Sequence, residues 1–202
     1  ETWDKARLVA DYREHRTFSG EIGGVKITTC STGAGSGSAS SAIEEVAELG
    51  ADTLIRVGSC GAIQEFINCG DVIIHSGAVR HDGTSNLYVD QAYPAAADYM
   101  VTAALVEAAE RLGYPYHVGY SCSTGSWYCG QGRPGYKGYT QSFIQNKVED
   151  LRRARVMNFE METSCLFTLA GLYGLRAGSV VLHLQTERKM RWLTAEWSAA
   201  FM

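Results

Sequence analysis

Apolar residues along the chain follow two spacings, which alternate from one segment to the next. Short runs rich in β-branched residues predict strands, and longer segments with apolar residues three and four positions apart predict helices. The predicted strands cover residues 25–32, 53–57, 71–74, 78–80, 116–121, 156–159 and 176–184. The predicted helices cover residues 40–49, 98–112, 143–153 and 163–173, and shorter helical patterns occur at 5–10 and 194–202.

Strands that alternate with helices predict an α/β fold with a mixed or mostly parallel sheet. No internal repeat divides the sequence, so we expect residues 1–202 to form one domain. In such folds the ligand site lies beyond the carboxyl ends of the strands. Polar side chains that follow predicted strands are therefore the first candidates for function.

The composition is that of a globular protein, with 46% hydrophobic and 20% charged residues among 202. The formal net charge is −4 and there is no run of Lys or Arg, which argues against nucleic acid as a partner. No apolar stretch approaches the ~20 residues needed to cross a bilayer, and the first residues lack a signal-peptide pattern. We therefore expect a cytoplasmic protein whose partners are neither nucleic acid nor membrane.

The six cysteines form no CxxC pair and have no histidine at zinc-finger spacing. They predict reduced cytosolic thiols, with metal binding disfavoured. A reactive cysteine is a second possibility, but no motif supports it. The cysteines are Cys30, Cys60, Cys69, Cys122, Cys129 and Cys165.

The first polar cluster is the stretch from Arg56 to Gly61. Arg56 comes late in a predicted strand that we expect Gly58 to end. Glycine lets backbone amides approach an anion, and Ser59 adds a hydroxyl donor. One fixed guanidinium with backbone donors suits a phosphate group.

A glycine-rich loop, Gly33 to Gly37, lies before the predicted helix 40–49. A helix N-terminus also favours anions. The loop matches neither of the common phosphate-binding patterns, GxxxxGK[ST] or GxGxxG with a later acid. Taken alone, the loop is better interpreted as a tight turn.

The second cluster, Gln131 and Arg133, follows the aromatic residues Trp127 and Tyr128. A glutamine amide both accepts and donates hydrogen bonds, whereas arginine only donates. The edge of uracil presents two carbonyl acceptors and an N–H donor, which matches this pair. The alternative is that both residues are solvated loop residues.

The third cluster is Glu160, Met161 and Glu162, at a predicted strand-to-helix transition. A carboxylate there can accept hydrogen bonds from the vicinal hydroxyls of a sugar. Alternatively it caps the next helix by accepting from its free amides. We interpret Glu160 as structural and Glu162 as functional. The five histidines are scattered, and neither His75 nor His117 has an obvious Ser or Asp partner, so the sequence does not support a hydrolytic triad.

Several motifs carry a resemblance to a known family. The most specific stretches are Ser31 to Gly35, Leu54 to Ile63, Gly70 to Ile74, Phe159 to Thr163, Gly174 to Gly178, and the Tyr-x-Gly-Gln-x-Arg pattern from Tyr128 to Arg133. Across roughly residues 12–186 the chain resembles the nucleoside phosphorylase family of the uridine-phosphorylase type. The resemblance implies an α/β/α sandwich of three layers around a central mixed sheet, in dimers or in hexamers made of three dimers.

The resemblance also implies a reaction, in which uridine and phosphate give uracil and ribose 1-phosphate reversibly. No cofactor is required, because inorganic phosphate is the co-substrate. The catalytic residues implied are Arg56, Gln131, Arg133 and Glu162. For uracil the implied contacts are Gln131, Arg133, Trp127, Ser59 and Gly61, for ribose Met161 and Glu162, and for phosphate Arg56, Ser59, Lys5 and Arg13.

Two further implications concern assembly. Arg13 matches a residue that reaches the site of the neighbouring subunit. Glu14, Ser38 and the carbonyl of Ala34 match positions where some relatives bind a cation between subunits.

Three other functions stay open at this stage. A purine nucleoside phosphorylase uses an Asp after the last strand, and residues 182–186 contain none. A nucleosidase uses water and needs no phosphate-binding arginines, so Arg56 and Arg13 speak against it. A non-catalytic nucleoside-binding module would not need the full set of Arg56, Gln131, Arg133 and Glu162.

Overall fold

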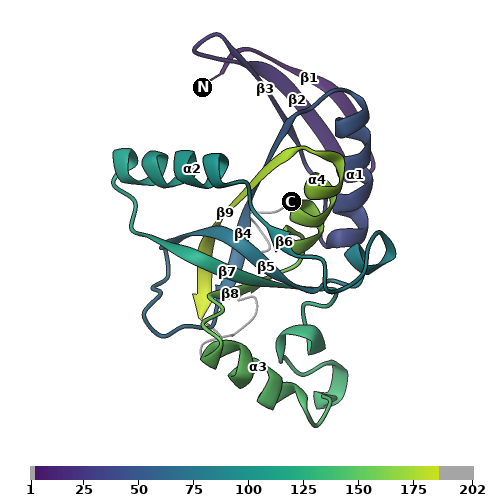
Figure 1. Cartoon of the computed structure of the whole chain (residues 1–202), viewed down its shortest axis with the longest axis vertical. Helices are drawn as coiled ribbons and strands as arrows, with labels where there is room; N and C mark the ends of the chain where they lie inside the picture. The colour runs from purple at the N-terminus through teal and green to yellow at the C-terminus, as the bar shows by residue number, and fades with distance from the viewer. Residues whose placement is uncertain (1–2, 187–202) are drawn as a thin grey trace.

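The structure is a computed structural model that describes residues 3–186. The described chain contains two sheets and four α-helices (Figure 1). The helices are α1 (Ser36–Glu48), α2 (Tyr99–Leu112), α3 (Ile144–Arg153) and α4 (Thr163–Tyr173). The strands are β1 (Asp4–Tyr12), β2 (His15–Ile22), β3 (Val25–Cys30), β4 (Thr53–Ala62), β5 (Val72–His81), β6 (Ala95–Ala96), β7 (Tyr116–Thr124), β8 (Asn158–Glu160) and β9 (Arg176–Thr186).

The larger sheet has six strands in the order β6-β5-β7-β8-β4-β9 and is mixed. β5, β7 and β8 run parallel to one another, as do β4 and β9, whereas β4 and β8 are antiparallel. A short antiparallel pairing between β5 and β9 makes the sheet curl back on itself. The short strand β8 therefore lies between β7 and β4, and whatever follows it lies at the middle of the sheet.

Helices cover both faces of this sheet. Ala177 of β9 belongs to a core cluster formed mainly by residues of α4, with Ile43 of α1. The next residue, Gly178, faces the other way, because a Cβ there would lie 2.5 Å from Val101 of α2. Successive strand residues point to opposite faces, so α4 and α2 cover opposite sides, and the predicted three-layer α/β/α fold is confirmed. Helix α3 adds Val148 to a separate cluster with strands β7 and β8.

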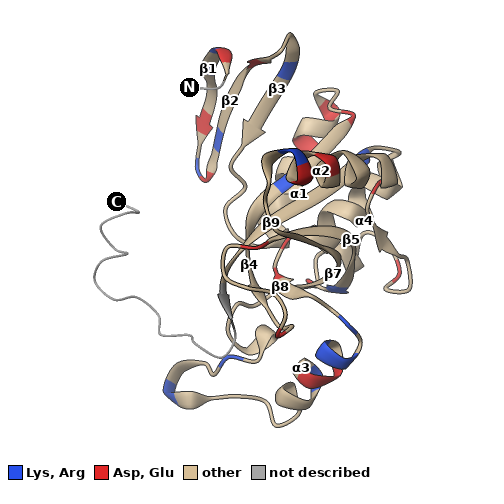
Figure 2. Cartoon of the chain, turned by 90° about the vertical axis from the view of Figure 1, so that its left-hand side faces the viewer, with Lys and Arg blue, Asp and Glu red and all other residues tan. Residues whose placement is uncertain are grey.

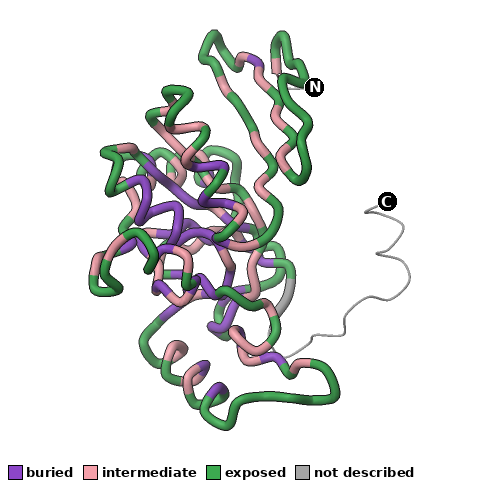
Figure 3. The backbone as a smooth tube through the Cα atoms, turned by 90° about the vertical axis from the view of Figure 1, so that its right-hand side faces the viewer, coloured by how far each residue is buried: buried purple, intermediate pink, exposed green. Residues whose placement is uncertain are grey.

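The three-stranded sheet, in the order β1-β2-β3, is antiparallel and stands apart from the larger one (Figures 1 and 2). Most of its residues are exposed, whereas buried residues gather in the large sheet and α4 (Figure 3). Acidic and basic residues are interspersed along the helices and the small sheet (Figure 2). Within residues 3–186 no helix combines the length and the apolar character that crossing a membrane requires.

Most predicted elements are confirmed, with shifted ends. Helix α4 has the predicted bounds, and α2 and α3 each begin one residue late. Helix α1 begins at Ser36, four residues before the prediction, because the glycine-rich turn is shorter than expected. The predicted strands 71–74 and 78–80 are one strand, β5, with an irregularity between His75 and Gly77.

Two predictions were wrong. The helical pattern at 5–10 is strand β1, whose backbone pairs with β2, so a tertiary partner overrides the local pattern. Gly58 does not end its strand, because β4 continues to Ala62 through pairing with β9. Arg56 therefore lies inside β4 rather than near its end. The predicted helix 194–202 lies outside the described residues.

Candidate active site

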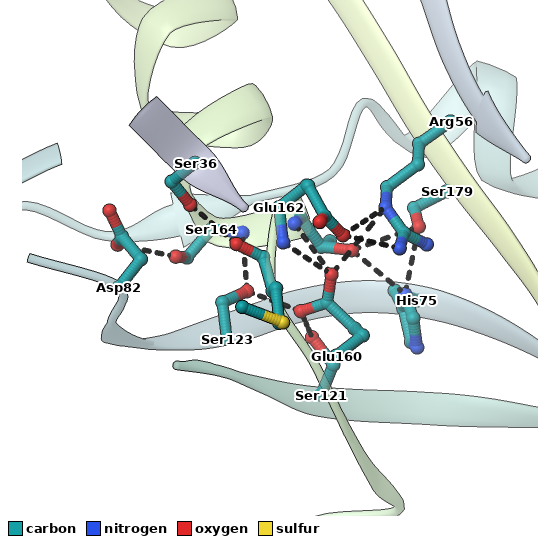
Figure 4. Close-up of polar contacts among 12 residues, drawn as sticks. Ser36, Arg56, His75, Asp82, Ser121, Ser123, Glu160, Glu162, Ser164 and Ser179 are labelled. Atoms are coloured by element: carbon teal, nitrogen blue, oxygen red, sulfur yellow. Dashed lines mark hydrogen bonds and ion pairs between the residues drawn. The ribbon is translucent and has the colours of Figure 1, made fainter. Parts of the chain in front are cut away.

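A buried carboxylate, Glu160, ends strand β8 at the middle of the sheet (Figure 4). One of its oxygens accepts hydrogen bonds from the backbone N–H groups of Glu162 (2.8 Å) and Thr163 (2.7 Å), which begin helix α4. The other accepts from the hydroxyls of Ser121 (3.1 Å) and Ser123. The interpretation of Glu160 as the structural carboxylate, capping α4, is therefore confirmed.

The groups around Glu160 keep its carboxyl group ionised. Burial alone raises the pKa of this carboxyl, but Arg56, His75 and the hydrogen bonds outweigh burial and lower the pKa to about 2. Glu160 is consequently ionised throughout the physiological range. Its nearest cationic atom is Nε of Arg56, at 3.6 Å.

Arg56 joins the two carboxylates of the cluster. Its Nη2 and Nε donate to one oxygen of Glu162, at 2.5 and 3.2 Å. Burial disfavours the guanidinium charge, yet Glu160 and Glu162 more than offset this effect, so the pKa of Arg56 is raised. The third nitrogen, Nη1, is buried and has no hydrogen-bond partner among the described residues. A buried guanidinium with one unpartnered nitrogen is a ready site for an anion.

Gly58 makes room for this guanidinium. Arg56 and Gly58 lie two apart on β4 and so share a face, and a Cβ at Gly58 would lie 2.7 Å from Nη1 of Arg56. The sequence suggested that Gly58 exposes backbone amides to an anion. The structure shows a further role, because the absent side chain makes room for the guanidinium of Arg56 beside Glu162.

The glycine-rich turn reaches the same carboxylate. The backbone N–H of Gly35 donates to the second oxygen of Glu162 at 2.5 Å, and Ser36 donates through its hydroxyl to the carbonyl of Met161 at 2.6 Å. Gly35 has φ 91°, a conformation that favours glycine. The reading of this loop as a mere turn was therefore incomplete, since it fixes Glu162 and Met161 against the start of α1.

A web of small hydroxyl groups lies behind the carboxylates, and sequence reasoning missed it. Ser123 also accepts from the backbone N–H of Ser164 (2.8 Å), and Ser164 donates to Asp82 (2.6 Å) (Figure 4). Each of these residues is buried. Serine is common in exposed loops, so only its position on a buried strand would have distinguished Ser123.

His75 is also part of the buried polar interior. Its Nδ1 lies 2.9 Å from the hydroxyl of Ser179 and its Nε2 lies 2.9 Å from the side-chain oxygen of Asn158. The expectation that His75 lacks a Ser partner was wrong, because the partner comes from β9. Burial lowers the pKa of His75 to about 4 against the opposing effects of Glu160 and Asn158, so the ring is neutral. His75 and Ser179 are both fully buried. His117 likewise has an acidic partner: its half-buried ring lies 2.9 Å from a carboxylate oxygen of buried Asp71.

The predicted base-reading pair is buried and tightly linked. Arg133 donates to the side-chain oxygen of Gln131 and to the carbonyl of Trp127 (2.6 Å). Its guanidinium lies over the Trp127 ring, 3.5 Å from the ring centroid. Gln131 donates in turn to the hydroxyl of Thr124 at 3.1 Å. The alternative that these are solvated loop residues is excluded, since Gln131 and Arg133 are only 4% and 6% exposed.

The base-reading pair and the carboxylate cluster meet at the end of β7. Its last two residues are Ser123, which holds Glu160, and Thr124, which holds Gln131. One strand end thus connects an amide–guanidinium pair with an arginine–carboxylate pair.

The remaining candidates lie elsewhere. Ser59 is exposed and lies three residues after Arg56, so it points away from the guanidinium. Lys5 pairs with Glu21 at 3.0 Å on the small sheet. Gly61 pairs with Phe159 of β8, close to the cluster, and Arg13 is exposed at the turn between β1 and β2. The structure does not bring Lys5, Arg13 or Ser59 to Arg56.

The proposed cation ligands do come together. The hydroxyl of Ser38 donates a hydrogen bond to the carboxylate of Glu14 at 2.7 Å. This bond is the main reason why the pKa of Glu14 is lowered. Ala34 follows Gly33, where a Cβ would lie 3.1 Å from Cγ of Glu14. Carboxylate, hydroxyl and carbonyl oxygens are suitable cation ligands.

Three of the cysteines are poor nucleophiles. Burial raises the pKa of Cys60, Cys122 and Cys165 to about 12 in each case. These thiols are therefore protonated at neutral pH, and thiolate chemistry does not arise from them.

Sequence comparison places this geometry in a family. Residues 4–198 match the phosphorylase superfamily. The chain belongs to the phosphorylase superfamily. Within it, the chain is 59% identical over 178 residues to a uridine phosphorylase of Thermococcus kodakarensis, a match that covers 88% of this chain and 64% of that protein. It is 42% identical over 178 residues to uridine phosphorylase of Escherichia coli, covering 88% and 70%.

A relative with another name is also similar. Guanosine phosphorylase of Halorubrum lacusprofundi is 36% identical over 177 residues, covering 88% of this chain and 68% of that protein. The similar proteins thus include some named for a pyrimidine nucleoside and one named for a purine nucleoside. The chain spans about two thirds of the length of these relatives, between 64% and 70%.

Proposed function

We propose that this protein catalyses the reversible phosphorolysis of uridine, giving uracil and ribose 1-phosphate. It would be a pentosyltransferase that needs no cofactor besides the co-substrate phosphate. The observation that carries the proposal is the buried guanidinium of Arg56, with one unpartnered nitrogen beside Glu162. The two relatives named for uridine, at 59% and 42% identity, support the choice of nucleoside.

Phosphate would bind at Arg56. The guanidinium already satisfies Glu162 through Nε and Nη2, which leaves Nη1 for an incoming oxyanion. Because the site is largely shielded from water, a charge-assisted hydrogen bond there is stronger than one on the surface. Lys5, Arg13 and Ser59 are not needed for this step within one chain, and their phosphate contacts remain predictions from the family resemblance.

The ribose would lie against Glu162 and Met161. A carboxylate has about four acceptor sites, of which Gly35 occupies one and Arg56 two, so Glu162 can still receive a sugar hydroxyl on the oxygen that binds Gly35. Glu162 thereby connects the sugar to the phosphate-binding guanidinium. This connection would align the phosphate oxygen with the anomeric carbon.

The base would be held by Gln131 and Arg133, with Trp127 forming the wall behind Arg133 and Gly61 close by. When the bond between the anomeric carbon and N1 breaks, its electron pair moves onto uracil. Arg133 stabilises this developing negative charge, while the phosphate oxygen forms the new bond to the anomeric carbon. No covalent enzyme intermediate is required.

The deciding experiment is an assay of phosphate dependence. The full chain is incubated with uridine, guanosine, inosine or methylthioadenosine, with and without phosphate, and free base is measured. We expect release of uracil that requires phosphate. Release without phosphate would indicate a nucleosidase, and cleavage of purine nucleosides alone would indicate the purine branch.

Replacement of Arg56 tests the phosphate site. Arg56→Ala should raise the KM for phosphate at least about tenfold, because the substitution removes a charge-assisted contact worth ~1.5–3 kcal/mol. Arg176→Ala is the matched control, since Arg176 is exposed and forms an ion pair with exposed Asp52 at 3.2 Å. An unchanged KM for phosphate in Arg56→Ala would reject the assignment.

Assembly and location complete the proposal. The protein would act in pyrimidine salvage in the cytoplasm. It would form a homodimer or a hexamer of three dimers, because Arg13 lies on an exposed turn where it can reach a second subunit. Glu14, Ser38 and the Ala34 carbonyl would hold a cation in such an assembly, and no chemical step depends on it. Sedimentation equilibrium that gives only the monomer mass at assay concentration would reject the shared site.

A further inference from the structure

Thr124 occupies a buried position between the two halves of the site. It is the last residue of β7 and is 2% exposed. Its hydroxyl oxygen accepts from Nε2 of Gln131 at 3.1 Å, and the hydroxyl donates to the carbonyl of Ser126 at 3.2 Å. Neither the sequence motifs nor the proposed mechanism assigns it a role.

Two groups fix the orientation of the Gln131 amide. Arginine can only donate, so Arg133 requires the amide oxygen on its side. The hydroxyl of Thr124 gives its proton to Ser126, so it must accept from Gln131, which places the amide nitrogen on the Thr124 side. The flipped amide would set donor against donor at Arg133 and leave Thr124 without its amide donor.

A fixed amide presents a fixed pattern to a ligand. The side-chain amide has two N–H groups and two lone pairs. Among the described residues, Thr124 takes one N–H and Arg133 takes one lone pair, which leaves one of each. A carbonyl next to an N–H, as on the edge of uracil, is complementary to that remainder. Cytosine presents the reverse order, a 4-amino donor next to a bare N3 acceptor, so in the same pose it would fit only the flipped amide.

We propose that Thr124 is a positioning residue that sets the base specificity of the site by locking the amide of Gln131. The inference rests on the proposed function, because it takes Gln131 to be the residue that meets uracil. Thr124 acts through Gln131 and does not itself touch the substrate. Its neighbour Ser123 is directed to Glu160 instead, so the two ends of the site are positioned by different hydroxyls.

The surroundings of Thr124 allow a clean substitution. Thr124 is 2% exposed, and a Cβ added at Gly130 would lie 3.3 Å from its Cβ, so Thr124 is closely surrounded. Valine has the same shape as threonine without the hydroxyl. Thr124→Val therefore removes the hydrogen bonds with little change of packing, and Thr124→Ser keeps the hydroxyl.

The test is a double-mutant cycle between Thr124→Val and Gln131→Ala, followed by uridine kinetics and by the Kd of uracil from calorimetry. Thr124→Val should lower kcat/KM for uridine and weaken uracil binding about five- to tenfold. Its KM for phosphate should be unchanged, and Thr124→Ser should stay within about twofold of wild type. In the Gln131→Ala background the valine substitution should have no further effect.

The outcomes separate the two proposals. Suppose that the wild type cleaves uridine and that Thr124→Val lowers kcat/KM equally in the wild-type and Gln131→Ala backgrounds. Thr124 would then be only structural, and the positioning proposal would fail while the proposed function stands. A parallel rise in the KM for phosphate would have the same meaning. A wild type that neither cleaves uridine nor binds uracil would overturn the proposed function and, with it, the role of Thr124.

Discussion

The carboxylate of Glu160 should contribute more to stability than any surface ion pair of this chain. Glu160→Gln keeps the shape of the side chain and removes its charge. The glutamine oxygen can still accept from the backbone N–H groups of Glu162 and Thr163. The amide nitrogen then faces Ser121 and Ser123, which have to turn their hydroxyls to accept, and Arg56 loses its second anion.

Two routes give the size of the effect. Breaking a buried ion pair by removing one partner costs about 3–5 kcal/mol. The pKa of Glu160 falls from 4.5 to about 2, and this shift corresponds to about 3 kcal/mol between the folded and unfolded states. Because Arg56 retains Glu162, the lower value applies, and we expect Glu160→Gln to lose about 3 kcal/mol of unfolding free energy.

Urea unfolding at fixed protein concentration measures this loss, with an unchanged m-value as the sign that only stability has changed. The folded-state pKa is depressed, so the contribution is complete above pH 4.5 and is lost as the pH falls toward 2. Wild type and Glu160→Gln should therefore converge as the pH falls below 4.5. Glu149→Gln is the matched control, because Glu149 accepts from Arg152 at 2.5 Å but is 44% exposed, and it should cost less than about 1 kcal/mol. A loss from Glu160→Gln no larger than that of the control would refute the reasoning.

Two further predictions concern the same region. Gly58→Ala would place a Cβ 2.7 Å from Nη1 of Arg56 and displace the guanidinium, so steady-state kinetics should show the KM for phosphate rising about tenfold. Gly37→Ala is the control and should leave this KM unchanged, because a Cβ there meets nothing within 4 Å. Equal effects of the two substitutions would contradict the packing argument. His75→Gln should flatten the pH dependence of stability: the unfolded histidine binds a proton near 6.5 and buried His75 only near 4, so wild type loses about 3 kcal/mol as the pH falls between these values. Denaturant titrations at pH 7, 5.5 and 4 measure the slope, which should decrease without vanishing, since two other histidines have lowered pKa values; an unchanged slope would contradict the burial argument.

The elements that sequence reasoning predicts best are those with local end signals. Asp98 accepts from the backbone N–H of Val101 and so begins α2, and Gly113 ends it in the left-handed conformation. Gly174 ends α4 in the same way. The end of β4 has no such signal, because Gly58 continues the strand wherever a neighbouring strand supplies hydrogen bonds. Pairing partners far along the chain, which a local pattern does not contain, decide such cases.

The site divides along similar lines. Glu160, Glu162, Gln131 and Arg133 stand out in the sequence, since charged or amide side chains beside strands and glycines suggest chemistry. The sequence does not show that Arg56 turns toward Glu162, because these residues are 106 positions apart. Buried hydroxyls such as those of Thr124 are equally hidden, since serine and threonine occur in every environment.

The separation of Arg56 from its carboxylates also has a consequence for how the chain folds. The hydrogen bond from Gly35 to Glu162 spans 127 residues, and the bond between His75 and Asn158 spans 83. Contacts between residues so far apart in the sequence form late and slow the folding of a domain. Until they close, a compact intermediate that buries Glu160 would have to bury an unpaired charge, which is strongly disfavoured. The charged centre of the protein therefore makes collapse and pairing a single cooperative event, and it selects against compact states in which the two halves of the chain have met incorrectly.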